Sequence, residues 1–110
     1  MATSELQTTV RDQDGVAVID LEGDVNSSAE SALNTAYADA ANRATGAVGL
    51  NFEHATYINS TGIALIVGLL AQARANGIEV KAYGLSDHYR EIFEITRLSD
   101  FITIEGNDHA

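Results

Sequence analysis

The side chains best suited to chemistry lie in one short segment, Asn59-Ser60-Thr61-Gly62. Asn, Ser and Thr all favour the position that caps the start of a helix, and this segment has more of them than one cap requires. The glycine that follows leaves room for a close approach to the backbone. The free N–H groups and the dipole of a helix start favour an anion such as a phosphate. An ordinary N-cap explains the same residues, and physical reasoning alone favours that simpler interpretation.

The helix expected after this segment has an unusually wide apolar arc. One stripe consists of Ile63, Ile66, Val67 and Leu70. A second flank consists of Leu65, Leu69 and Gln72. Two interpretations stand side by side: neighbouring elements cover the whole arc, or part of the arc is a surface that binds a partner protein.

The usual signatures of an active site or a metal site are missing from the sequence. It contains no Gly-x-x-x-x-Gly-Lys phosphate loop, no Gly-x-Gly-x-x-Gly turn and no Gly-x-Ser-x-Gly nucleophile elbow. It has no cysteine, and its three histidines lack the spacing of metal ligands. His54 precedes the expected helix, and an exposed loop residue explains it better than a catalytic base. We therefore expect a protein without catalytic residues, metal or cofactor.

Composition and charge are those of an acidic globular domain. The chain has 110 residues, of which 45% are apolar and 20% charged, so one domain is expected. A formal charge of −10 repels nucleic acid and anionic lipid surfaces. No segment resembles a signal peptide or the apolar stretch of about 20 residues that crosses a membrane. We expect a cytoplasmic protein that neither binds nucleic acid nor inserts into a membrane.

Strand and helix patterns alternate along the chain. The expected strands cover residues 6–11, 16–21, 48–52, 78–82 and 101–104. Asp14-Gly15 between the first two is a hairpin signal. The expected helices follow Ser27, which opens a capping-box pattern with Glu30, then Ser60, and then Ser86. A loop is expected over residues 54–57.

This alternation predicts an α/β fold. We expect a mostly parallel sheet of four to five strands with an antiparallel edge hairpin, and helices packed on it. The domain is expected to span residues 1–110, with 106–110 as a flexible tail.

Three segments resemble motifs of the STAS domain family, which includes bacterial anti-sigma factor antagonists and the cytoplasmic modules of sulfate transporters. Gly23-Asp24-Val25-Asn26 resembles the family's Gly-x-Leu-Asp. Asn59-Ser60-Thr61-Gly62-Ile63 resembles its Asp-Ser-Ser-Gly-Leu. Ile92-Phe93-Glu94-Ile95-Thr96-Arg97-Leu98 resembles its Leu-Phe-x-x-x-Gly-Leu. The set, in this order and spacing, covers nearly the whole chain and implies a STAS-like domain.

The resemblance implies a binding module that is switched by phosphorylation. In antagonists of this family, the unmodified protein binds a kinase-type anti-sigma factor, or a related serine kinase, and phosphorylation of the first Ser of the central motif releases it. That Ser is Ser60 here, with Thr61 as the less favoured acceptor. A phosphatase is a further expected partner, and we expect a monomer or a weak homodimer. The expected partner surface consists of Asn26, Asn59, Ser60, Thr61, Gly62, Leu65, Leu69 and Gln72.

The sequence departs from the family pattern near the expected phosphorylation site. Asn26 and Asn59 stand where the family has aspartates. Asparagine keeps the size and the hydrogen bonding but removes a charge that a kinase or phosphatase reads. Arg97 stands where a glycine is common.

A function of a different class is a small-ligand sensor. Such a sensor would hold an anionic nucleotide or a lipid head group at the start of the second helix. Native mass spectrometry of freshly purified protein distinguishes the two classes. A retained small molecule indicates the sensor, and a bare chain indicates the partner-binding module.

Overall fold

A computed structural model describes residues 5–43 and 46–105. The elements, in chain order, are β1 (Gln7–Gln13), β2 (Val16–Val25), the 3-10 helix η1 (Ser27–Ala29), α1 (Glu30–Arg43), β3 (Ala47–Ile58), α2 (Ser60–Ala75), β4 (Glu79–Tyr83), α3 (Asp87–Ile95), the 3-10 helix η2 (Leu98–Asp100) and β5 (Thr103–Ile104). The expected tail over 106–110 lies outside the described residues. None of the described helices is long and apolar enough to cross a membrane.

The strands form one five-stranded sheet in the order β1-β2-β3-β4-β5. The β1–β2 pair is antiparallel, and every later pair is parallel. Asp14 (φ +53°) and Gly15 (φ +86°) form the turn between β1 and β2, with the positive φ angles of a type I′ hairpin. The α/β fold and the antiparallel edge hairpin predicted from the sequence are confirmed.

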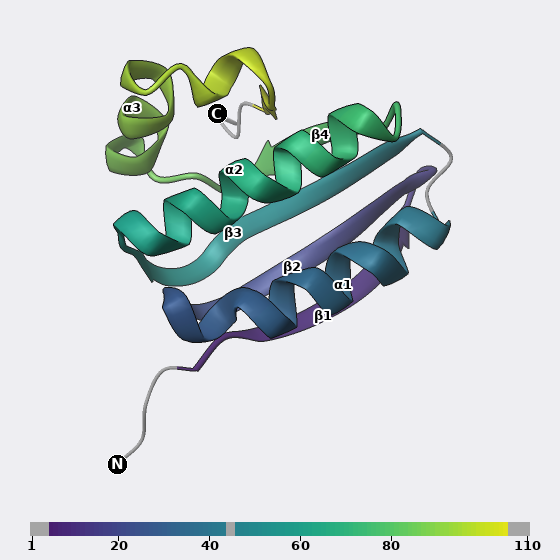
Figure 1. The fold of residues 1–110 in the computed structure, drawn as a ribbon, viewed down its shortest axis with the longest axis horizontal. Helices are drawn as coiled ribbons and strands as arrows, with labels where there is room; N and C mark the ends of the chain where they lie inside the picture. Colours follow the sequence, from purple (N-terminus) through teal and green to yellow (C-terminus); the bar gives the residue numbers. More distant parts are fainter. Residues whose placement is uncertain (1–4, 44–45, 106–110) are drawn as a thin grey trace.

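The helices α1 and α2 lie side by side on one face of the sheet, α1 over β1 and β2, and α2 over β3 and β4 (Figure 1). Alternate strand residues point to this face. Those of the central strands include Ile19, Leu21, Val48, Leu50 and Phe52, which are all buried. They pack with buried residues of both helices in a single core. This packing fixes the position of α2, and with it the segment that precedes α2.

Two local predictions are wrong. The loop expected over 54–57 is part of β3, because β2 extends beyond its expected end and keeps pairing with β3 as far as Val25 and Ile58. This pairing passes through two register irregularities, which break the alternation that sequence reasoning relies on. The expected cap at Ser27 is also wrong. Asn26 caps this helical segment instead, and its side chain accepts a hydrogen bond from the Ser28 N–H.

Candidate functional site

The segment of residues 59–62, which we call the 59–62 turn, connects β3 to α2. Asn59 is the N-cap of α2, and its Oδ1 accepts a hydrogen bond from the Gly62 N–H at 2.8 Å. The backbone N–H of Asn59 donates to the Val25 carbonyl at 3.2 Å. The turn is therefore tied both to the helix that follows it and to the neighbouring strand β2.

At Gly62 the backbone of α2 lies close to the backbone of β2. A Cβ atom at this position would lie 2.0 Å from the carbonyl oxygen of Val25 and 2.7 Å from its carbonyl carbon. Both are backbone atoms, so no side-chain rotation relieves the clash. Gly62 is buried, and the close approach expected from the sequence is made by the chain's own backbone. The structure gives Gly62 a packing role, and its part in a partner surface stays a prediction.

Asn26 lies beside Asn59 because of the sheet register. Val25 and Ile58 are register partners at the carboxyl ends of two parallel strands. The residues that follow them, Asn26 and Asn59, therefore leave the sheet next to each other. Oδ1 of Asn26 accepts hydrogen bonds from the Ser28 N–H at 3.0 Å and the Ser28 hydroxyl at 2.7 Å. Both asparagines thus cap helices with neutral side chains.

Ser60 and Thr61 are the exposed residues of this site. They occupy the first two positions of α2, where backbone N–H groups have no partner within the helix. No acidic residue occupies the first turn of α2. The site therefore combines an exposed hydroxyl, a positive helix end and an uncharged cap, an environment that accommodates a negative group.

Comparison with known proteins places this geometry in a family. A family model described as "Mlab, STAS domain" matches residues 8–104. The chain belongs to the STAS domain family. The sequence motifs of this STAS domain lie where the fold brings them together: the first at the end of β2, and the second at the start of α2.

Relatives and solved structures show what this STAS domain is similar to. The anti-sigma-B factor antagonist of Staphylococcus aureus (strain NCTC 8325 / PS 47) is 38% identical over 60 residues, which are 54% of this chain and 56% of that protein. The chain thus spans about half the length of the curated relatives it matches. An anti-sigma factor antagonist from Mycobacterium paratuberculosis has a similar structure, with a TM-score of 0.75, 20% identity, and coverage of 96% of this chain and 90% of that one.

The anti-sigma factor antagonist SpoIIAA in its unphosphorylated form aligns with a TM-score of 0.68 and 18% identity, over 94% of this chain and 89% of that one. The same protein is described as a Bacillus cell fate determinant in its phosphorylated form. At these identities the structural matches show a shared fold, which is the STAS fold.

The flank of α2 predicted as a partner surface is only partly exposed. Gln72 is exposed and Leu65 is half-buried, but Leu69 is 5% exposed and belongs to the core. The placement of Leu69 at the surface is wrong, because α2 packs against the sheet and also against α1, and two neighbours cover a wide arc. The exposed side of α2 instead presents Ala64, Val67, Gly68 and Ala71.

One charged cluster lies on the opposite face of the sheet from the core. Arg11 donates from Nε and Nη2 to the carboxylate of Asp20, at 2.7 and 3.1 Å, and Nδ2 of Asn51 donates to it at 2.8 Å. The hydrogen bond from Arg11 is the main cause that holds the pKa of Asp20 below its ordinary value, and the same bond raises the pKa of Arg11. Asp20 is thus a paired carboxylate rather than a free acid. Across the part of the chain that the structure describes, no group of side chains is arranged to hold a metal ion.

Proposed function

We propose that this STAS domain is an anti-sigma factor antagonist, which binds a kinase-type anti-sigma factor through the 59–62 turn and the exposed side of α2. In this proposal the kinase phosphorylates Ser60, and the complex then dissociates. The names of the relatives and structural neighbours support the class of function. The observation that carries the proposal is the exposed Ser60 hydroxyl at a helix start that Asn59 caps and β2 holds in place.

A phosphate on Ser60 would leave the fold intact. It adds a charge of about −1.5 to −2 at the positive end of α2, which the helix dipole favours. The Asn59 side chain accepts its hydrogen bond from the Gly62 N–H. The backbone N–H groups of Ser60 and Thr61, the first two helical residues, therefore stay available to a phosphate oxygen. Phosphorylation therefore weakens binding of the partner, through charge repulsion and through the cost of removing water from the phosphate.

The proposed surface consists of Asn26, Asn59, Ser60, Thr61, Leu65 and Gln72, the predicted residues with exposed or half-buried side chains. Gly62 and Leu69 are buried beneath this surface and pack against the rest of the domain. Because an anti-sigma factor acts on transcription, the proposal places the domain in the cytoplasm. A phosphatase that restores the unmodified form completes the proposed cycle.

The test uses the purified chain and a kinase-type anti-sigma factor from the same organism. Isothermal titration of the Ser60→Ala and Ser60→Asp variants measures affinity for this factor, with Thr61→Ala as the matched control. Ser60→Ala and Thr61→Ala each remove a single hydroxyl from the proposed surface, so we expect them to bind within about threefold of the parent chain, and Ser60→Asp to lose at least about tenfold in affinity. Mass spectrometry after incubation with the kinase and ATP should place the phosphate on Ser60. Phosphate on Thr61 alone, or equal binding by the two Ser60 variants, would contradict the proposal.

Asn59→Asp tests the role of the missing aspartate. A carboxylate at Asn59 keeps the N-cap hydrogen bond but repels a phosphate on the adjacent Ser60. We expect the variant to unfold at the same temperature as the parent before phosphorylation, or slightly above it. After phosphorylation it should unfold at a lower temperature than the phosphorylated parent. Calorimetric scans of the parent and the variant, each with and without phosphate, give this comparison. If phosphorylation changes the unfolding temperature of both proteins equally, residue 59 has no part in the switch.

A further inference from the structure

A groove runs between α2 and the η2 segment that follows α3. Its apolar lining includes Val67 and Leu70 from α2, with Leu98 and Phe101 from the C-terminal segment, and its volume is about 370 Å³. Val67 is 43% exposed and Phe101 is 50% exposed, so large apolar side chains meet solvent on both sides of the groove. Exposed apolar surface gathered in a concave site is typical of a binding surface.

Basic side chains line the groove, although the chain is strongly acidic. Arg74 and Arg97 line it, and none of its described lining residues is acidic. The whole chain has only 6 basic residues against 16 acidic ones. A groove with this lining favours an occupant that carries negative charge.

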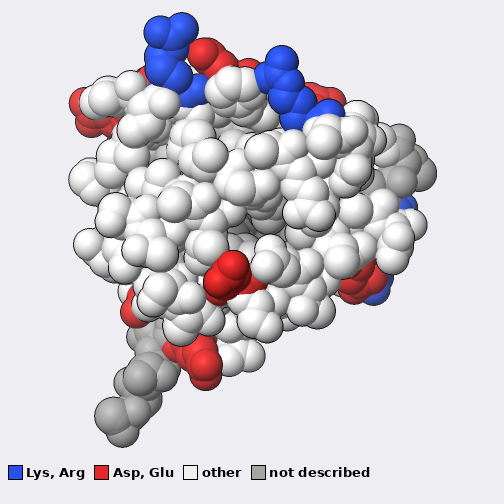
Figure 2. All heavy atoms as spheres, viewed as in Figure 1, with Lys and Arg blue, Asp and Glu red and all other residues white. Residues whose placement is uncertain are grey.

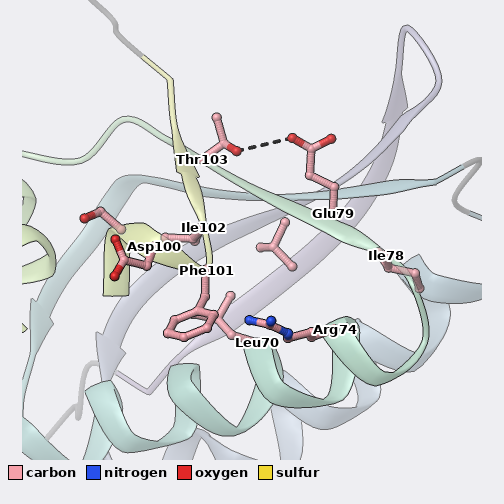
Figure 3. Close-up of a pocket in the computed structure, with 10 residues that line it drawn as sticks. Leu70, Arg74, Ile78, Glu79, Asp100, Phe101, Ile102 and Thr103 are labelled. Carbon is pink, nitrogen blue, oxygen red and sulfur yellow. Dashed lines mark hydrogen bonds between the residues drawn. The ribbon is translucent and has the colours of Figure 1, made fainter. Parts of the chain in front are cut away.

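Of the two arginines that line the groove, Arg74 is the one without an ion pair among the described residues. Its guanidinium carbon lies 5.1 Å from the centre of the Phe101 ring, and within 5–43 and 46–105 no carboxylate lies at ion-pair distance from it. Figure 3 draws a neighbouring pocket that shares Leu70, Arg74 and Phe101 with the groove. It shows Arg74 beside Phe101 and Leu70, and the nearby Glu79 pointing to Thr103, whose hydroxyl donates to it at 3.2 Å. Arg97, in contrast, is paired with Asp100 at 3.2 Å. Arg74 is therefore placed to bind a carboxylate from outside the chain.

The groove is continuous with the proposed Ser60 surface. Val67 follows Ser60 by seven positions, which is about 10 Å along a helix. The exposed side of α2 between them consists of small or uncharged residues. Figure 2 shows this helix-bearing face as mostly white, with blue and red side chains side by side at the upper edge, where α3, η2 and the C-terminal end of α2 lie in Figure 1. One partner can therefore cover both places.

We propose that the groove binds an acidic, amphipathic segment of the anti-sigma factor that docks on the 59–62 turn, an inference that rests on the function proposed above. The apolar side chains of the segment pack against Val67, Leu98 and Phe101. A carboxylate of the segment pairs with the guanidinium of Arg74, in the charge-assisted geometry that arginine favours. This contact lies away from the phosphorylated residue, so it contributes affinity that phosphorylation of Ser60 does not remove directly.

The test selects ligands for the groove without assuming the sequence of the partner. A phage library of random dodecapeptides is selected on the full chain, and fluorescence polarisation measures the affinity of the enriched peptides. We expect enriched peptides with apolar side chains and an excess of Asp and Glu. Val67→Asp and Arg74→Glu should each weaken their binding by at least about tenfold. Arg74→Gln should show an intermediate loss.

Matched controls separate groove binding from general effects. Ile95→Asp changes an apolar residue that is 72% exposed but does not line the groove. Arg43→Glu makes the same charge reversal at the end of α1. Both should bind the enriched peptides as the parent does, and circular-dichroism melts should show all variants folded.

Three results would overturn the inference. These are an enrichment of basic peptides, peptides that bind Val67→Asp and Arg74→Glu as well as the parent, and no enrichment at all. Analytical ultracentrifugation adds a fourth, because a concentration-dependent dimer that Val67→Asp abolishes would show that a second copy covers the groove. Ser60→Asp should leave peptide binding unchanged. A failure of the Ser60 switch with Arg74-dependent peptide binding retained would therefore count against the proposed function alone.

Discussion

The two halves of α2 each contain one glycine, and the surroundings of these glycines are opposite. Gly62, near the start of the helix, is buried, and a Cβ atom there would lie 2.0 Å from a backbone oxygen. Gly68 is exposed, and a Cβ atom there would meet nothing within 4 Å. The first half of α2 is thus held by direct backbone contact with β2, whereas the second half contacts the rest of the molecule through side chains and leaves a groove beside it. The difference separates a closely packed start of α2, where the proposed switch lies, from a more open second half, which lies beside the groove.

The largest effect is expected at Leu69, which follows Gly68 and points into the core. Leu69→Asp buries an unpaired charge and should lower the free energy of unfolding by about 4 kcal/mol. Gln72→Asp, on the exposed side of the same helix, should change it by less than about 0.5 kcal/mol. Urea unfolding followed by circular dichroism measures both. If Leu69→Asp is as stable as the parent chain, Leu69 must lie at the surface, which would contradict the placement of α2.

Gly62→Ala should have the next largest effect and sharpens the comparison of the two glycines. The added methyl group forces α2 away from Val25, and we expect a loss of about 3 kcal/mol in unfolding free energy. Gly68→Ala is the matched variant and should raise the unfolding free energy by about 0.5–1 kcal/mol, because alanine favours a helix more than glycine does. Equal effects of the two variants would show that the start of α2 is not the tighter half.

Asn59→Ala removes the cap that orients the 59–62 turn. The Gly62 N–H loses its acceptor, and an N-cap of this type contributes about 1 kcal/mol. Thermal unfolding should show this loss, and Asn59→Ser should recover most of it because serine also caps helices. The backbone hydrogen bond from Asn59 to Val25 is kept in both variants, so a loss in Asn59→Ala that serine does not recover would indicate that the Asn59 side chain contributes more than the cap.

Apart from the control variants, the smallest effect is expected at Arg97, which lines the groove. Arg97 has a φ of +67°, a left-handed conformation that is costly for residues other than glycine. Arg97→Gly relieves this strain but adds freedom to the unfolded chain, so the unfolding free energy should rise by less than about 1 kcal/mol. Arg97→Ala keeps the strain and is the control. If both variants unfold at the same denaturant concentration, backbone strain at this position is negligible.

The Arg97 backbone also explains a sequence observation in physical terms. The resemblance places a glycine at this position in the family, and the positive φ is the conformation for which glycine is suited. Likewise, the Asp14-Gly15 signal predicted the hairpin correctly, because its positive φ angles depend on local residue types alone. Signals of this kind are short-range, which is why the sequence carries them clearly.

What the sequence did not predict depends on contacts between distant segments. The burial of Leu69 follows from α1 packing beside α2, and apolar spacing within α2 does not show which flank a second helix covers. The groove was missed because Val67 and Phe101 belong to separate elements. The 59–62 turn was recognised from its residue types, but its attachment to Val25 required the register of β2 and β3. Its roles in partner binding and phosphorylation stay predictions.

The strand order also has a consequence for how the chain folds. Each strand of the sheet pairs with the strand that precedes it in the chain, so no strand pairing closes a loop across the whole domain. Short sequence separations between contacting segments favour rapid folding. During synthesis, β3 can add to the β1–β2 hairpin, and α2 can follow, before β4 and β5 are made. The segments that form the 59–62 turn are therefore made before η2, which completes the groove.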